Sequence, residues 1–130
     1  MKGLLVITAI TFIVPASLAD ESIIGTWRDK TEPNSYEYKF NNENDFVFTR
    51  KLTYKGETKS QVLKGVWEIG SWKITNSFGL TESCNLTIYA GTQECCFEYK
   101  FVANNLILEN KYNPNNASYM CNNRVLIRGE

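Results

Sequence analysis

The chain contains no histidine, and its 130 residues include only three prolines and two methionines. Histidine is the commonest general acid–base in enzymes and a frequent metal ligand, so its absence removes the usual centre of such sites. The sequence also lacks the Gly-x-Ser-x-Gly motif of serine hydrolases and a glycine-rich phosphate loop. These absences favour binding over catalysis. They predict that the protein is not an enzyme and needs no cofactor or metal ion.

The chain also lacks an excess of charge, because 14 lysines and arginines balance 14 aspartates and glutamates. Surfaces that bind nucleic acid or anionic membranes need clustered positive charge, whereas the two signs are mixed along this sequence. We therefore expect no nucleic-acid partner. Beyond the N-terminus, no run approaches the roughly 20 apolar residues of a membrane-spanning helix, so no membrane span is expected.

One apolar run is present, at residues 4–14, and it has the features of a secretory signal. Lys2 supplies a positive start, and a small-x-small triplet ending at Ala19 fits a cleavage site. A membrane anchor is the alternative, but the run is shorter than the roughly 20 residues of a span. The sequence thus predicts a cleaved signal peptide over residues 1–19, a single domain over residues 20–130, and a secreted or periplasmic location.

All four cysteines lie in the predicted mature chain, at Cys84, Cys95, Cys96 and Cys121. An even number of cysteines in a small exported domain is typical of disulfides. A bond between the two neighbours would be strained, so Cys84 and Cys121 are each expected to pair with one of them, in either order. A zinc site is a poorer interpretation, because paired Cys-x-x-Cys units are missing.

Hydrophobic residues in the mature chain recur with period two rather than with helical period. Turn-forming residues interrupt this alternation at fairly even intervals, and Gly70-Ser71 predicts a tight reversal. Eight or nine short strands joined by hairpins favour an antiparallel meander that closes into a small barrel, with a β-sandwich as the alternative. The predicted strands cover residues 23–29, 36–40, 46–54, 63–69, 72–74, 86–90, 97–101, 106–108 and 125–127.

The predicted inward-facing positions are rich in aromatic residues. Large rings fill the interior of many small barrels, but an apolar chamber with a few polar groups is also what a ligand site needs. A filled core and a ligand cavity are therefore both compatible with the pattern. The aromatic positions are Tyr36, Tyr38, Phe40, Phe46, Phe48, Trp67, Phe97, Tyr99 and Phe101.

Arg50 has the same parity as Phe48 and Leu52, so a regular strand would turn its charge toward the barrel interior. A buried charge is costly unless it is paired. We consider two predictions for this residue. In one, its planar donor fork binds the carboxylate of an apolar ligand. In the other, a β-bulge or the open end of the strand carries the side chain to water.

Gly25-Thr26-Trp27 stands near the start of the mature chain, and an alternating Tyr-x-Tyr-x-Phe strand and Gly65-Val66-Trp67-Glu68 follow it. This arrangement resembles the lipocalins and their calycin relatives, whose first strand carries a Gly-x-Trp motif. The resemblance implies a ligand-binding barrel in which Trp27 plugs one end and Arg124 or Arg128 packs across it. A guanidinium stacks favourably on an indole face. The chain is shorter than a typical lipocalin and shows no C-terminal helix pattern.

These observations predict an exported protein that binds a small apolar or amphipathic molecule in an aromatic-lined barrel. The alternative is a protein-interaction module, such as an inhibitor of a secreted or host enzyme, because small rigid β domains often act through their loops. Its loops would be residues 76–83 and 112–118, with Phe78 and Tyr119 as anchors if they are exposed. The predicted ligand-binding residues are Tyr36, Tyr38, Phe48, Arg50 and Tyr99.

Overall fold

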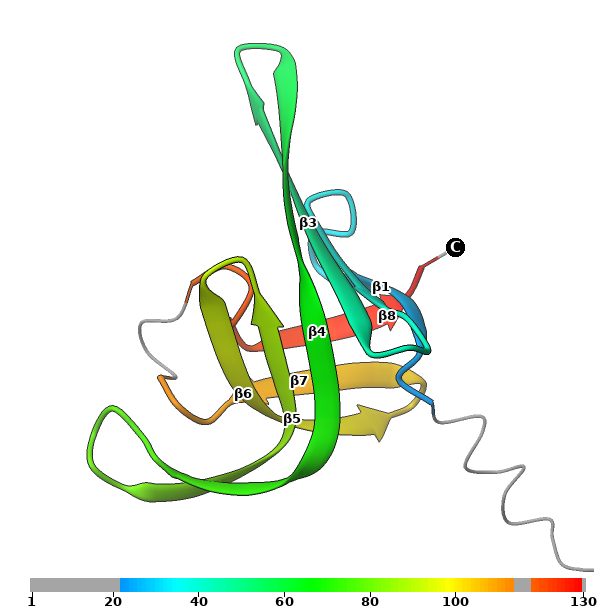
Figure 1. The fold of residues 1–130 in the computed structure, drawn as a ribbon. Helices are drawn as coiled ribbons and strands as arrows, with labels where there is room; N and C mark the ends of the chain where they lie inside the picture. The colour runs from blue at the N-terminus through cyan, green and yellow to red at the C-terminus, as the bar shows by residue number, and fades with distance from the viewer. Residues whose placement is uncertain (1–21, 114–117, 130) are drawn as a thin grey trace, which may run out of the picture.

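The computed structural model describes residues 22–113 and 118–129, and within them the chain forms eight antiparallel strands and no helix. Each strand pairs with the next along the chain, and β8 pairs with β1, which closes the sheet into a barrel (Figure 1). This confirms the predicted barrel over the sandwich, whereas the predicted signal peptide lies outside the described residues. No described helix is long and apolar enough to cross a membrane. The strands are β1 (Gly25–Asp29), β2 (Tyr36–Phe40), β3 (Asp45–Tyr54), β4 (Glu57–Thr75), β5 (Thr81–Ala90), β6 (Gln93–Val102), β7 (Asn105–Asn110) and β8 (Arg124–Arg128).

The alternating sequence pattern corresponds to the two faces of the sheet. In β2, Tyr38 and Phe40 are buried while Lys39 between them is exposed, because successive side chains of a strand point to opposite faces. The hairpin between β3 and β4 turns through Lys55 and Gly56, whose φ angles are 53° and 79°. A two-residue turn with positive φ at both positions matches the twist of the flanking strands, and it needs glycine or another tolerant residue.

The reversal predicted at Gly70-Ser71 is wrong, because β4 continues through these two residues. The register with β5 shifts there, so that Ile69 pairs with Leu86 and Trp72 pairs with Cys84. The extra residue forms a β-bulge, a feature that glycine accommodates and that bends a strand without ending it. The chain reverses farther on, where Asn76 accepts and donates the hydrogen bonds of a turn.

The barrel interior is filled by the predicted aromatic residues together with aliphatic ones. Tyr38, Phe40 and Phe97 have no exposed surface, and Phe46 and Phe48 are each 1% exposed. Their rings pack against one another, for example Tyr38 edge-on to Phe48 with centroids 5.1 Å apart. Aromatic pairs prefer such tilted contacts, and close packing of this kind gives the barrel a solid core. The aliphatic core residues are Leu86, Ile88, Leu106, Leu108, Met120 and Leu126.

Two disulfides staple the barrel, and each neighbouring cysteine takes a different distant partner, as predicted. Cys84 bonds to Cys96 and joins β5 to β6. Cys95 bonds to Cys121 and ties the segment before β8 to β6. Disulfides of this kind persist in oxidising surroundings, so the pair of bonds indicates an extracellular or other oxidising environment for the protein.

Two hairpins extend beyond the barrel (Figure 1). The end of β3 and the beginning of β4, over residues 49–62, form a two-stranded arm. In this arm Leu52 and Tyr54 are 48% and 73% exposed. The second hairpin joins β4 to β5 and carries the exposed side chains of Phe78 and Leu80. Both hairpins place apolar groups in solvent, outside the core that stabilises the rest of the molecule.

Candidate functional site

Four side chains form a continuous stack at the end of the barrel from which the β3–β4 arm departs. The guanidinium carbon of Arg50 lies 3.5 Å from the ring centroid of Tyr119, and that of Arg124 lies 3.9 Å from the ring of Tyr36. The two tyrosine rings lie between the arginines, nearly parallel, with centroids 6.3 Å apart. Each arginine therefore contacts one ring face, an arrangement that the ring quadrupole stabilises. We call this group the mouth stack.

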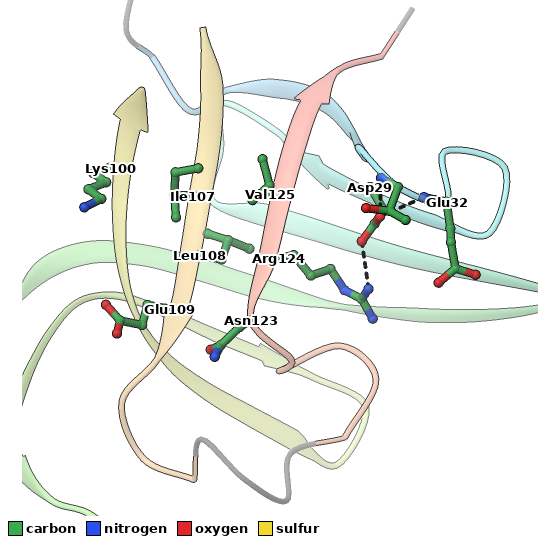
Figure 2. Close-up of a pocket in the computed structure, with 10 residues that line it drawn as sticks. Asp29, Glu32, Lys100, Ile107, Leu108, Glu109, Asn123, Arg124 and Val125 are labelled. Carbon is green, nitrogen blue, oxygen red and sulfur yellow. Dashed lines mark hydrogen bonds and ion pairs between the residues drawn. The ribbon is translucent and has the colours of Figure 1, made fainter. Parts of the chain in front are cut away.

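Arg124, at one end of the mouth stack, has a partner for each of its three nitrogens. Its Nε donates to the Tyr38 hydroxyl at 2.8 Å, and one terminal nitrogen donates to the Tyr119 carbonyl at 2.7 Å. The other forms an ion pair of 2.9 Å with Asp29 (Figure 2). Because this side chain is only 7% exposed, such complete pairing is what makes its burial tolerable.

The titratable groups around Arg124 respond to burial and to their partners. Burial raises the pKa of Asp29, but backbone hydrogen bonds from Glu32 and Thr31 and the bond from Arg124 outweigh it and lower the pKa overall. Burial also raises the pKa of Tyr38 well above its ordinary value, although Arg124 partly opposes this. The pair is therefore charged at neutral pH beside a neutral tyrosine, which indicates a structural clamp.

Arg50, at the other end of the mouth stack, is half-buried and has a different environment. It forms none of the ion pairs seen among the described residues, and its buried Nε has no hydrogen-bond partner there. It lines a cavity of about 130 Å³, which we call the mouth cavity and whose apolar lining is Phe48, Leu63 and Met120. The polar side chains at the rim are Gln61, Gln93 and Ser118.

In the part of the chain that the structure describes, the five predicted ligand-binding residues lie in three different places. Tyr38 and Phe48 belong to the filled core, and Tyr36 is a member of the mouth stack. Only Phe48 and Arg50 line the mouth cavity. Tyr99 packs against Phe101 near the opposite end. Alternation correctly assigned these side chains to one face of the sheet, but it carries no information about whether that face encloses space.

The other end of the barrel holds Trp27 and Arg128, two of the residues to which the resemblance to lipocalins assigned the closing of a barrel end. The guanidinium carbon of Arg128 lies 4.1 Å from the Trp27 ring, and Trp27 is 1% exposed. Arg128 also donates to the carbonyls of Ile24 and Ser22, at 2.8 and 2.6 Å. Of the two arginines considered, Arg128 covers Trp27, whereas Arg124 belongs to the mouth stack.

An open groove of about 540 Å³ runs over the outer surface beside the Asp29–Arg124 pair (Figure 2). Ile107 and Val125 form part of its lining together with charged side chains of both signs. Small-molecule sites usually enclose most of the ligand surface, which an open groove does not do. We therefore do not assign the groove a ligand.

The turn between β4 and β5 presents apolar side chains on a braced backbone. Phe78 and Leu80 are 59% and 58% exposed. The Asn76 side-chain oxygen accepts hydrogen bonds from the backbone amides of both residues, each at 2.9 Å. The Ser77 amide donates to the carbonyl of Tyr112 at 2.9 Å, which fastens the turn to the segment after β7. The predicted anchor Phe78 is thus exposed and held in place.

Tyr119, the second predicted anchor, is 48% exposed but is held between Arg50 and Tyr36.

Among the described residues, no cluster of His, Cys, Asp or Glu side chains is able to hold a metal ion. The chain matches no protein-family model, no curated protein and no solved structure.

Proposed function

We propose that the mature chain is an exported protein-recognition module that binds a protein partner through the β4–β5 turn. One observation carries this proposal: Phe78 and Leu80 are exposed on a turn whose backbone is already fixed by Asn76. A few anchor side chains that become buried at the centre of an interface supply much of its binding energy. A turn that is ordered before binding loses less conformational entropy on association.

The packing of the barrel supports the same function. The interior positions that a ligand would occupy hold buried side chains of the core, such as Tyr38, Phe46 and Phe97. Small eight-stranded barrels have interiors just wide enough to be filled in this way. The disulfides fix the barrel further, and together with the predicted signal peptide they support a secreted or periplasmic location. The barrel then serves as a rigid base for its hairpins.

Site-specific photo-crosslinking tests this function in the compartment to which the protein is exported. A photoreactive phenylalanine at position 78 should form a discrete adduct with one partner protein. The same group at Val102, which is 50% exposed on β6, is the matched control and should form none. Excess unlabelled wild-type protein should abolish the adduct, whereas a Phe78→Ser, Leu80→Ser double variant with unchanged thermal stability should not. Equal labelling from both positions would contradict the proposal.

Binding of a small molecule is a second candidate function, favoured by the mouth cavity and by the unpaired Nε of Arg50. Native mass spectrometry of the exported protein separates the two functions. A bound mass that is lost on denaturation supports ligand binding, and an adduct at position 78 with a bare native mass supports protein recognition. The mouth cavity and the β4–β5 turn have no lining residue in common.

A further inference from the structure

The two arginines of the mouth stack lie in similar settings but differ in how their charge is balanced. Arg124 stacks on Tyr36 and is paired with the carboxylate of Asp29. Arg50 stacks on Tyr119, but no carboxylate of the described chain reaches it. A half-buried guanidinium with an unsatisfied Nε is unfavourable, because the lost hydration is not replaced. Arg50 therefore lacks a carboxylate partner of the kind that Asp29 provides for Arg124.

The neighbouring charges would attract an anion to this place. Residues 49–62, which form the arm, include Arg50 and three lysines against a single acidic residue, Glu57. Clustered positive charge raises the local concentration of anions. Gln61 and Gln93 also line the cavity, and their amide groups are able to donate hydrogen bonds to a bound anion.

The shape of the cavity restricts the size of the anion. Its volume of about 130 Å³ corresponds to roughly four water molecules. Phe48 and Met120 at its apolar side are 1% exposed and belong to the core, so the cavity does not continue into the barrel. A carboxylate with a short apolar group fits these limits, because one end meets Arg50 and the other meets Leu63 and Phe48.

We propose that the mouth cavity is a binding site for a short-chain monocarboxylate, whose carboxyl group pairs with Arg50. The planar guanidinium presents its two terminal nitrogens side by side, which matches the two oxygens of a carboxylate. Stacking on Tyr119 fixes the plane of the fork before the acid arrives. The site is separate from the β4–β5 turn, so this proposal does not depend on the protein-recognition function.

NMR titration of the full mature protein with a series of sodium carboxylates tests the site. Acetate, butyrate and octanoate are the probes, and sodium chloride and sodium phosphate at matched ionic strength are the controls. The backbone amides of Arg50, Gln93 and Met120 should shift in a saturable manner. The affinity should rise from acetate to butyrate and rise no further at octanoate, because the cavity ends at the core.

Variants assign the effect to the guanidinium. Arg50→Gln should weaken butyrate binding by at least about tenfold, since the charge-assisted pair is lost. Lys51→Gln, which changes an exposed neighbour, should leave the affinity unchanged. If Arg50→Gln fails to fold, Gln61→Trp is the second test, because a larger ring at the rim should block the cavity while the charge is kept.

The proposal is overturned if Arg50→Gln or Gln61→Trp folds and binds butyrate as the wild type does. Equal binding of phosphate and butyrate would show a general anion effect and would also overturn it. So would an affinity that keeps rising at octanoate, because that result would mean that the ligand enters the barrel interior. None of these outcomes bears on crosslinking at position 78.

Discussion

Asp29 at the end of β1 and Arg124 at the start of β8 form an ion pair of 2.9 Å across the seam that closes the barrel. Their side chains are 9% and 7% exposed, and the carboxylate also accepts two backbone hydrogen bonds from the loop that follows β1. The same guanidinium stacks on Tyr36 and bonds to the Tyr119 carbonyl. Closure of the barrel and the geometry of its mouth thus depend on one network.

Asp29→Asn should destabilise the protein by about 3 kcal/mol, because it leaves the buried charge of Arg124 without a counter-charge. Urea unfolding at neutral pH measures the free energy. The matched control is Glu37→Gln, which removes the ion pair with Arg28, whose two side chains are each 33% exposed, and should cost no more than about 1 kcal/mol. Similar losses in the two variants would contradict a special role for the seam pair.

The stability of the wild-type protein should fall in acid because of the same carboxylate. The pKa of Asp29 is lower in the folded protein than its ordinary value of 3.8. The stabilisation is therefore complete above that ordinary value and is lost as the pH falls toward the folded pKa. Unfolding free energies measured from neutral pH downward should decline less for Asp29→Asn than for the wild type. Parallel curves would show that other carboxyl groups cause the acid response.

Tyr38→Phe should destabilise the protein by about 1–3 kcal/mol, although it removes only one oxygen atom. The hydroxyl donates to the Met120 carbonyl at 2.7 Å and accepts from Arg124 at 2.8 Å, and Tyr38 has no exposed surface. Both partners would be left unsatisfied in the interior. Chemical denaturation gives the loss, and Tyr89→Phe, at a 55% exposed position of β5, is a control that should have little effect. A loss as small as that of the control would refute the importance of this hydroxyl.

Local patterns in the sequence were sufficient to predict the barrel. Alternation defines the faces of β2 and β6, and short turns such as Lys55-Gly56 join neighbouring strands. Antiparallel hairpins depend on nearby residues, so such patterns specify them well. The same reasoning failed at Gly70-Ser71, because a turn and a bulge require the same residue types. At Gly70-Ser71 the structure is a bulge and not a turn, because β4 pairs with β5 both before and after these two residues. Such pairing is a nonlocal property.

The candidate site was predicted only in part. Arg50 was singled out because its charge interrupts an apolar alternation, and it lines the mouth cavity. No local pattern pointed to Asp29, which lies 95 residues from Arg124 and meets it only when the barrel closes. Whether aromatic side chains fill a barrel or line a chamber depends on their volumes and rotamers across several strands, which periodicity does not encode.

Removing Cys95–Cys121 should destabilise the protein somewhat more than removing Cys84–Cys96. The bonds close segments with separations of 26 and 12 residues, and chain entropy gives about 3.5 and about 2.8 kcal/mol, respectively. Paired cysteine-to-alanine variants, compared by urea unfolding, measure both losses. Only the first bond holds the segment that carries Tyr119, so only its removal should also weaken butyrate binding. Equal weakening by both variants would argue against that link.

Arg128→Ala should destabilise the protein by about 1–2 kcal/mol, because it removes a cation–π contact with Trp27 and uncovers a buried ring. Arg128→Lys keeps the charge but lacks the planar fork that reaches the Ile24 and Ser22 carbonyls, so it should restore only part of the stability. Chemical denaturation ranks the three proteins. Since the contact lies at the end opposite the mouth stack, butyrate affinity should not change in either variant. Full rescue by lysine would mean that charge alone, and not stacking, stabilises this end of the barrel.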